Sequence, residues 1–255
     1  MNEDVDWWKS FHVIEMADLF LQRSTDEELR ETVAFLSEQL ELTRGKRVYD
    51  QCCGVGTLSL ELAKANINAV GADLCEVYIQ RAKQDAESQN ASCEFVCDDA
   101  FSFVPTLPCD ATFNWYSSFG YASSDQRNES MLQRAFESLK PGGMFAMDVP
   151  NFPSLIRNFQ FHLVRHGQSN GRDVTCLRES KIDWETGQLK QTWKWFSDNS
   201  AVVTRNSELR LYWPHQIQEM LWRVGFRQIR MLGDIDERSL DFDSPRLILI
   251  ARRPA

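Results

Sequence analysis

The sequence has no long apolar run and no cluster of basic residues. No stretch approaches the ~20 apolar residues that span a bilayer, and the first ten residues, MNEDVDWWKS, are acidic and lack the apolar core of a signal peptide. No basic run is longer than a pair, and the formal net charge is −9. Because contacts to phosphates need lysines and arginines on one face, we expect no nucleic-acid partner, no membrane contact and a cytoplasmic protein.

The sequence also lacks a cysteine framework. Its seven cysteines are an odd number and none forms a C-x-x-C pair, so we expect neither a set of structural disulfides nor a metal site. Cys52, Cys53, Cys75 and Cys97 all follow or end predicted strands. Free cysteines are usually small buried groups. Our additional hypothesis is that at least one of these four lines a ligand pocket.

The length and composition predict one α/β domain with an insertion. A chain of 255 residues with 43% hydrophobic and 25% charged residues can bury one core. Short apolar runs alternate with helical segments over the first 150 residues. We divide the chain into an N-terminal helical segment (1–44), a core (45–151), an inserted antiparallel ribbon (152–212) and a C-terminal helix with a closing hairpin (213–255).

The stretch VYDQCCGVGT, Val48 to Thr57, combines a short strand, a tight loop and the start of a helix. The strand reaches an acid at Asp50, and the loop contains Gly54 and Gly56. Because glycine has no Cβ and accepts positive φ, such a loop lets the backbone approach a ligand closely. A carboxylate at Asp50 would repel a pyrophosphate and attract an ammonium or sulfonium group. The stretch therefore favours a cationic nucleoside without phosphates.

Two further predicted strands end on acids. NAVGADL ends on Asp73, whose carboxylate can accept both hydroxyls of a ribose. CEFVCDDAFSF continues into Asp98 and Asp99, and Asp98 is expected to face solvent. Parallel strands end at a common edge of the sheet, so these acids should gather beside Asp50.

The fourth and fifth predicted strands add polar and aromatic groups to the same edge. The segment from Cys109 to Tyr121 ends in a polar and aromatic run where a core strand would simply turn. A Lys-Pro-Gly-Gly turn precedes the fifth strand, and Asp148 and Asn151 lie at that strand's far end. Ligands of open α/β folds bind in the crevice at this edge. The fourth-strand run that we place there is Asn114, Trp115, Tyr116, Ser117 and Ser118.

Taken in order, these motifs resemble those of class I S-adenosylmethionine-dependent methyltransferases of the small-molecule type, over most of residues 45–150 and the final hairpin. The run SSFGY is similar to the matching stretch of deoxyaminosugar N-methyltransferases. The family usually places small residues, mostly glycine, at alternate positions of the first motif. Here those positions are Cys52, Gly54 and Gly56, and Cys52 makes the turn less permissive.

The resemblance implies a seven-stranded Rossmann-like sheet with the last strand antiparallel and helices on both faces. It implies an enzyme that binds S-adenosylmethionine across the first four strand ends. The methyl group would pass by direct displacement to N or O of a small-molecule metabolite, in small-molecule biosynthesis. In this family Asp99 would hold the adenine amine while its apolar neighbour covers the ring.

The residues that we assign to the cofactor lie at the strand ends and in the N-terminal segment. They are Trp8, Asp50, Cys52, Cys53, Gly54, Gly56, Thr57, Asp73, Leu74, Asp99, Ala100, Phe101, Asn114 and Trp115.

An amine acceptor must lose a proton before it attacks, and the candidate catalytic bases are His12, Tyr116, Tyr121 and Asp148. In similar enzymes the N-terminal segment often closes over the cofactor, so we predict a lid that includes Trp7, Trp8, Phe11 and His12.

Secondary-structure signals place the remaining elements. Trp8, Phe11 and Ile14 could form one helical stripe, and a second helix begins after a cap at Thr25. Alternating segments at about 174–184, 189–196 and 201–212 predict the antiparallel ribbon. Helices over 76–89 and 128–139, a helix that stops at Gly225, and strands over 226–232 and 246–252 complete the chain.

The ribbon is rich in aromatic residues that need a surface to cover. They can pack onto the core, form a homodimer contact, or build a wall around the substrate. The residues concerned are Trp184, Trp193, Trp195, Phe196, Tyr212 and Trp213.

Three rival functions remain open at this point. A NAD-dependent oxidoreductase would share the strand, the glycine loop and a later acid, although Asp50 and the Lys-Pro-Gly-Gly turn disfavour it. A non-methylating enzyme that uses S-adenosylmethionine, such as an intramolecular cyclase, would share every motif. A non-catalytic binding or dimerisation module is disfavoured by the polar residues at the sheet edge.

Overall fold

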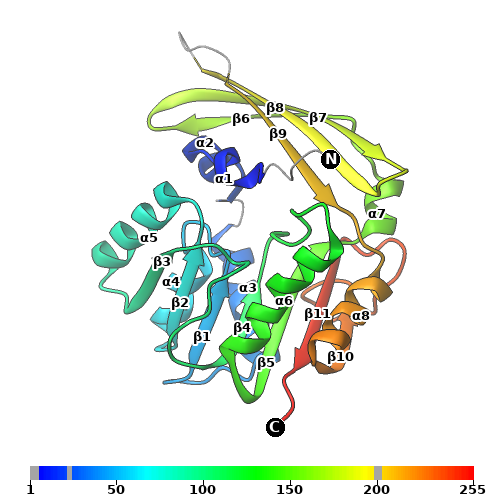
Figure 1. The fold of residues 1–255 in the computed structure, drawn as a ribbon. Coiled ribbons are helices and arrows are strands. Elements are labelled where there is room, and N and C mark those ends of the chain that lie inside the picture. The colour runs from blue at the N-terminus through cyan, green and yellow to red at the C-terminus, as the bar shows by residue number, and fades with distance from the viewer. Residues whose placement is uncertain (1–5, 22–24, 198–202) are drawn as a thin grey trace.

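The chain folds into two sheets, one of which arches over the end of the other (Figure 1). The structure is a computed structural model, and it describes residues 6–21, 25–197 and 203–255. The larger sheet has seven strands in the order β10-β11-β5-β4-β1-β2-β3, and the smaller has four in the order β6-β7-β8-β9. The short helices at the N-terminus lie between the two sheets (Figure 1).

The seven-stranded sheet confirms the predicted Rossmann-like fold. Neighbours among its first five strands pair in parallel, whereas β11 runs antiparallel to both β5 and β10. Its strands are β1 (Arg47–Gln51), β2 (Asn68–Asp73), β3 (Cys93–Cys97), β4 (Cys109–Asn114), β5 (Leu139–Pro150), β10 (Arg227–Leu232) and β11 (Arg246–Arg252).

Helices cover both faces of this sheet, as predicted. On one face α3 (Asp26–Gln39), α4 (Thr57–Lys64) and α5 (Glu76–Gln89) bury apolar side chains against the strands. On the other face α6 (Asp125–Ser138) and α8 (Pro214–Val224) do the same. This burial of apolar surface on both sides is what stabilises a parallel sheet.

Local capping explains where the helices begin and end. The Thr25 hydroxyl accepts the Glu28 N–H (3.2 Å) while the Glu28 carboxylate accepts the Thr25 N–H (2.9 Å), so α3 starts at the predicted cap. Helix α6 begins three residues before the predicted Asn128, because Ser124 caps it by accepting the Arg127 N–H. Helix α8 stops at Gly225, whose φ of 122° favours glycine.

The predicted ribbon is a four-stranded antiparallel sheet. Its strands are β6 (His162–Ser169), β7 (Arg172–Asp183), β8 (Gln188–Ser197) and β9 (Val203–Arg210), and the helix α7 (Phe152–Arg157) precedes it. Sequence analysis missed β6, an edge strand with few apolar residues. The first residues of the third predicted segment, 201–202, lie outside the described part of the chain.

One face of the small sheet carries Trp193 and Trp195 and packs on the N-terminal segment. Trp193 and Trp195 contact Phe11 and Phe20 in a single buried cluster. The opposite face carries ion pairs such as Lys194 with Glu179. Trp184 is 68% exposed, so the aromatic residues of the ribbon do not act as one group.

The N-terminal segment differs from the predicted single stripe. His12 has extended backbone angles and divides the segment into α1 (Trp8–Phe11), α2 (Ile14–Met16) and the π-helix η1 (Ala17–Leu21). Trp8 and Phe11 are buried, whereas Ile14 packs in another cluster, beside Val55. None of the helices in the described part of the chain is long and apolar enough to cross a membrane.

Candidate functional site

A cavity lies at the carboxyl ends of β1, β2 and β3, beneath α1. All but Gly56 and Asn114 of the predicted cofactor residues line it, as do the predicted bases other than Asp148. Cys52 and Cys53 line it too, in accord with the hypothesis for the four cysteines, whereas Cys75 and Cys97 do not. The lining residues are Trp8, His12, Leu21, Asp50, Cys52, Cys53, Gly54, Val55, Thr57, Leu58, Asp73, Leu74, Tyr78, Asp99, Ala100, Phe101, Trp115, Tyr116, Ser118, Tyr121 and Met131.

This first cavity is electronegative. Asp50, Asp73 and Asp99 line it, and no lysine or arginine does so among the described residues. Asp50 is 3% exposed and accepts a hydrogen bond from Ser59 (2.7 Å), and burial raises its pKa to about 7. Burial likewise raises the pKa of Asp73. A cationic ligand would favour the ionised forms of both carboxyls, so the cavity fits a cation.

Asp73 also fixes the glycine loop. One carboxylate oxygen accepts the Gly54 N–H (2.9 Å) and the other accepts the Cys75 N–H (2.9 Å). Each carboxylate oxygen can accept a second hydrogen bond, so Asp73 retains capacity for two hydroxyl groups.

The loop itself contains three positive-φ residues. Gly54 has φ 57° and lines the cavity, whereas Cys52 adopts φ 65°, a conformation that is costly for a residue with a side chain. Gly56, with φ 76°, precedes α4. A Cβ at Gly56 would lie 2.6 Å from the Phe95 ring, so this glycine serves packing and not the cavity wall.

The third strand presents one acid to the cavity and one to solvent, as predicted. Asp98 is exposed, whereas Asp99 lines the cavity and its carboxylate accepts the Phe101 N–H (3.0 Å). The Phe101 ring lies 5.4 Å from the Trp8 ring, measured between centroids. The Arg127 guanidinium sits 4.9 Å from the Trp8 centroid. These contacts close one end of the cavity with aromatic faces.

The N-terminal segment is fastened across the cavity at several points. Asp6 forms a bidentate ion pair with Arg127 (2.5 and 2.9 Å). The Trp7 indole N–H donates to the Tyr121 carbonyl (3.2 Å), and the Tyr78 hydroxyl donates to a carbonyl of the segment (3.0 Å). The segment therefore lies where the predicted lid would lie.

A second cavity of about 420 Å³ lies between the N-terminal segment and the inner face of the small sheet. His12, Leu21, Tyr116 and Tyr121 line both cavities, so the two spaces meet at these side chains. Burial lowers the pKa of His12, and its buried Nδ1 has no hydrogen-bond partner among the described residues.

The turn that carries Tyr116 has strained backbone angles, and hydrogen bonds to Asp148 on β5 hold it in place. Tyr116 and Ser117 have φ of 61° and 67°, and their N–H groups donate to the carboxylate and the carbonyl of Asp148 (3.2 and 3.1 Å). Arg246 pairs with the same carboxylate at 2.9 Å. Asp148 is therefore buried behind the turn, outside both cavity walls, and supports Tyr116.

Two other predicted residues also lie outside the cavities. Asn114 is buried between strands and donates to the Gln51 carbonyl (3.2 Å). Asn151 donates to the Asp241 and Ser244 carbonyls (3.0 and 2.9 Å). Both side chains sit at the predicted edge, but their amides bond to the backbone of neighbouring segments.

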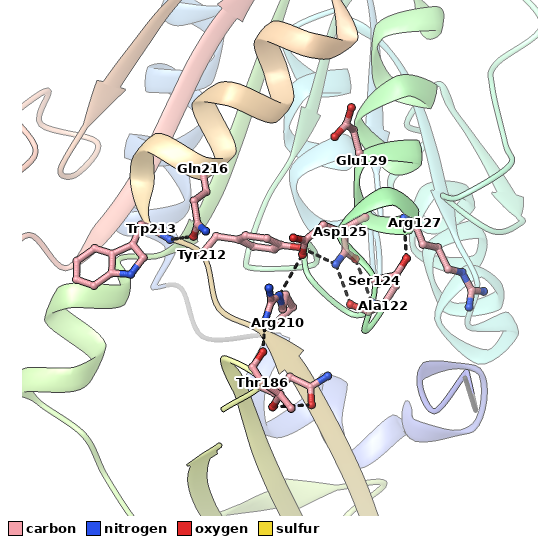
Figure 2. A network of polar contacts seen from close by, with 12 residues as sticks. Ala122, Ser124, Asp125, Arg127, Glu129, Thr186, Arg210, Tyr212, Trp213 and Gln216 are labelled. Atoms are coloured by element: carbon pink, nitrogen blue, oxygen red, sulfur yellow. Dashed lines mark hydrogen bonds and ion pairs between the residues drawn. The ribbon is translucent and has the colours of Figure 1, made fainter. Parts of the chain in front are cut away.

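A polar network steadies the loop that carries Tyr121 (Figure 2). The Asn128 amide bonds both the N–H and the carbonyl of Ala122 (3.0 and 2.8 Å) and donates to the Tyr212 hydroxyl (2.8 Å). That hydroxyl donates in turn to Asp125 (2.9 Å). The end of the small sheet is thereby tied to the loop at the junction of the cavities.

Sequence reasoning missed several wall residues. Val55 belongs to a motif already recognised, so its neighbours gave a signal. Tyr78 and Met131 come from helices, and no local pattern marks which helical side chain will reach a cavity. The second cavity was missed almost entirely, because its walls come from the N-terminal segment, the residues around α7 and three strands of the small sheet.

Residues 48–143 match the family model described as a methyltransferase domain. The chain is 31% identical over 127 residues to the S-adenosyl-L-methionine-dependent Diels-Alderase iccD of Talaromyces variabilis. That stretch covers 48% of this chain and 42% of the relative, so the chain matches less than half the length of that protein.

Solved structures resemble the whole chain. The CcbJ methyltransferase from Streptomyces caelestis has a TM-score of 0.79 at 17% identity, and the match covers 98% of this chain and 99% of that one. The sugar N-methyltransferase KedS8 from a Streptoalloteichus species has a TM-score of 0.74 at 17% identity, over 96% and 94% of the two chains. At such identities the likeness establishes the fold.

Proposed function

We propose that this chain, whose residues 48–143 match the model of a methyltransferase domain, is an S-adenosylmethionine-dependent methyltransferase that acts on a small-molecule acceptor. The observation that carries the proposal is the meeting of two cavities at His12, Tyr116 and Tyr121. One cavity is lined by carboxylates at three strand ends, and the other is a larger space with mostly apolar walls.

The residues of the first cavity fit the cofactor. Asp73 would hold the ribose hydroxyls, Asp99 and Phe101 the adenine, and Asp50 with the glycine loop the amino-acid part. The side chains of Trp8 and Trp115 both line this cavity, and their buried indole N–H groups have no partner among the described residues. When bound, S-adenosylmethionine supplies a methyl group activated by its sulfonium charge.

The chain's own contribution is enclosure and alignment. Holding acceptor and methyl donor in line lowers the barrier by roughly 7 kcal/mol or more. The lid and the small sheet exclude water, and the aromatic ring of Tyr116 at the junction can stabilise a nearby cation.

Among the candidate bases, His12 has the best placement. Burial keeps its imidazole neutral near pH 7, its side chain lines both cavities, and its Nδ1 has no hydrogen-bond partner among the described residues. Burial also raises the pKa of Tyr121, so that hydroxyl keeps its proton and acts as a donor. Asp148 supports the Tyr116 turn and would act on catalysis through it.

Calorimetric titration tests the cofactor half of the proposal. S-adenosylhomocysteine should bind the purified protein and NAD should not, and Asp73→Ala should abolish most of the affinity. Equal affinity of the parent and the Asp73→Ala protein for S-adenosylhomocysteine would contradict it. The transfer itself is tested by incubating the protein with S-adenosylmethionine and a metabolite library, and by seeking S-adenosylhomocysteine together with products that have gained one methyl group.

A second candidate function is cyclisation without methyl transfer. The sequence similarity to the Diels-Alderase iccD favours it, and the second cavity, of about 420 Å³, could fold a reactive chain back on itself. Here the product would have the mass of its substrate and S-adenosylmethionine would remain intact. Intramolecular attack on the cofactor would instead release methylthioadenosine from enzyme and cofactor alone.

A further inference from the structure

Among the described residues, Arg178 is the one lysine or arginine that lines the second cavity, and it is a half-buried cation without a counter-ion. Arg178 lies on β7, and its guanidinium sits 5.3 Å from the centre of the Trp193 ring on β8. Its Nε is buried without a hydrogen-bond partner, and no side-chain hydrogen bond or ion pair of Arg178 is found within the described ranges. By contrast, Lys190 and Lys194 on the outer face of the same sheet pair with carboxylates at 2.8 and 2.7 Å.

The neutral polar groups beside Arg178 also have donors to spare. The Trp193 indole donates to the Ser207 hydroxyl (2.9 Å), Ser207 donates to Gln191 (3.4 Å), and Gln191 donates to the Ser180 hydroxyl (3.2 Å). In this series of hydrogen bonds, one N–H of the Gln191 amide and the hydroxyl hydrogen of Ser180 have no acceptor among the described residues. If the nitrogen and oxygen of the Gln191 amide are exchanged, one amide N–H and one hydroxyl hydrogen are still without an acceptor. The wall therefore offers hydrogen-bond donors and needs acceptors.

No carboxylate offsets this positive charge. The described residues that line the second cavity include no Asp or Glu, although the whole chain carries a formal net charge of −9. Burial lowers the pKa of Arg178, which reports the cost of keeping this cation from water. A buried charge is stable only when paired or hydrogen-bonded. A cationic amino group would meet repulsion here.

The rest of the cavity limits the shape and charge of the ligand. Its remaining walls are mostly apolar, with Phe11, Phe20 and Leu189 among them. One guanidinium balances one negative charge, and its planar fork matches a carboxylate with two parallel hydrogen bonds. A pyrophosphate would need further cations. Arg178 does not line the first cavity, so its partner is a part of the acceptor remote from the methyl group.

We propose that the acceptor is an apolar or aromatic carboxylic acid, whose carboxylate is anchored by Arg178 with Gln191 and Ser180 on the inner face of the small sheet. This inference rests on the proposed function and names its substrate class. Arg178 is a specificity-determining residue, because it holds the acceptor and does not touch the reacting atoms.

The test compares matched probes on the protein saturated with S-adenosylhomocysteine. The probes are 3-phenylpropionate, indole-3-propionate and 2-naphthylacetate, each with its primary amide, together with 2-phenylethyl phosphate. Calorimetry and quenching of tryptophan fluorescence measure their affinities for the parent, Arg178→Gln, Arg178→Lys and the control Arg165→Gln. Arg165 lies on the neighbouring strand β6, over the Phe20 ring, and does not line the cavity.

In the parent and in Arg165→Gln the acids should bind about tenfold more tightly than their amides, because a hydrogen bond to a charged group is the stronger kind. Arg178→Gln should reduce that ratio to near unity, and Arg178→Lys should retain part of it. Unchanged affinity for S-adenosylhomocysteine shows that a variant is folded. If Arg178→Gln misfolds, Arg178→Met takes its place.

Three results would overturn the inference: no preference for acids in the parent, a preference that survives loss of Arg178, or no binding of any probe at its solubility limit. Tighter binding of the phosphate monoester would overturn the carboxylate assignment. If S-adenosylhomocysteine does not bind, the probes are measured on the free protein; a preference for acids that depends on Arg178 would then remove the proposed function and leave the anion site standing.

Discussion

The ionised form of Asp50 favours binding of a cationic ligand but lowers the stability of the free folded protein. Its pKa is raised from 3.8 to about 7 by burial, and the hydrogen bond from Ser59 only partly offsets this. A carboxyl whose pKa is higher in the folded state favours folding at low pH, and that contribution is lost as the pH rises through 7. Asp50→Asn should therefore stabilise the free protein at about pH 8, by on the order of 2–4 kcal/mol, and the gain should vanish near pH 4.

Urea unfolding at several pH values measures this gain, and the exposed Asp98→Asn serves as the control. The same substitution should weaken binding of S-adenosylhomocysteine, and the affinity of the parent should rise between about pH 6 and pH 8 as Asp50 ionises. A gain in stability that does not depend on pH would contradict this account of Asp50.

Cys52 is strained where a glycine would be relaxed. With φ at 65°, any side chain at this position meets the cost of the left-handed conformation. Alanine normally favours folding more than glycine does, because glycine loses more chain entropy. At this position we expect the order to reverse, with Cys52→Gly more stable than Cys52→Ala by about 0.5–1 kcal/mol. Thermal unfolding of the two variants measures this difference in stability. A more stable alanine variant would contradict strain at Cys52.

At the scale of elements, the ion pair between β5 and β11 holds the turn that follows β4. Arg246→Met leaves the Asp148 carboxylate buried without its cation, and should cost about 2–4 kcal/mol near pH 7. The pKa of Asp148 is already raised to about 6, mainly by burial, and Arg246 restrains it. Without Arg246 the pKa rises further, so the loss should shrink as the pH falls and the carboxyl takes up a proton.

Urea unfolding of Arg246→Met at about pH 5 and pH 7.5 provides the measurement. Asp148→Asn in the same background should recover part of the stability, because it removes the unpaired charge. An equal loss in the free energy of unfolding at both pH values would show that Arg246 stabilises the protein by packing alone.

Arg127 on α6 attaches the N-terminal segment through an ion pair with Asp6. Arg127→Gln removes the bidentate contact with Asp6 and the cation beside Trp8. The affinity for S-adenosylhomocysteine should fall roughly 3- to 10-fold, because a partly exposed pair is worth about 1 kcal/mol. Amide exchange in residues 8–21 should accelerate. Arg134→Gln, on the same helix but paired with Glu137, is the control and should change neither quantity.

At the scale of the whole molecule, one polar network ties the end of the small sheet to α6, which packs on the large sheet. Arg210, at the end of β9, donates to Asp125 (3.1 Å) and to the Thr186 carbonyl, and Asp125 also accepts from Tyr212 (Figure 2). Tyr212→Phe removes the shared hydroxyl and leaves Asn128 without one partner. We expect a loss of about 1–2 kcal/mol.

Because this network joins the small sheet to α6, which packs on the large sheet, we expect a single unfolding transition in the parent protein and in Tyr212→Phe. Far-ultraviolet circular dichroism follows the helices, and tryptophan fluorescence reports on all eight tryptophans, among them Trp193 and Trp195 of the small sheet. The two signals should coincide at one urea midpoint, and Tyr212→Phe should lower it for both. Two separate midpoints in the parent would show that the small sheet is an independent unit. A homodimer through that sheet stays a prediction, which sedimentation can test.

Most of the large sheet could be predicted from sequence because its signals are local. Apolar runs that end on Asp50 and Asp73, the cap at Thr25 and the stop at Gly225 each depend on a few neighbouring residues. Parallel strands end at a common edge, so knowing the strands was enough to gather the acids. The edge strand β6 escaped because a half-exposed strand carries little apolar periodicity.

By itself the sequence determined the class of fold, the edge of the sheet at which the first cavity lies, and the charge of that cavity. Only the tertiary structure decided which side chains reach a cavity: it placed Asp148 behind a turn, turned Gly56 toward Phe95, and brought Arg178 to face the N-terminal segment. The reason is geometric. A position at a strand end fixes the edge on which a residue lies, whereas its neighbours across the cavity come from distant parts of the chain, and only packing brings them together.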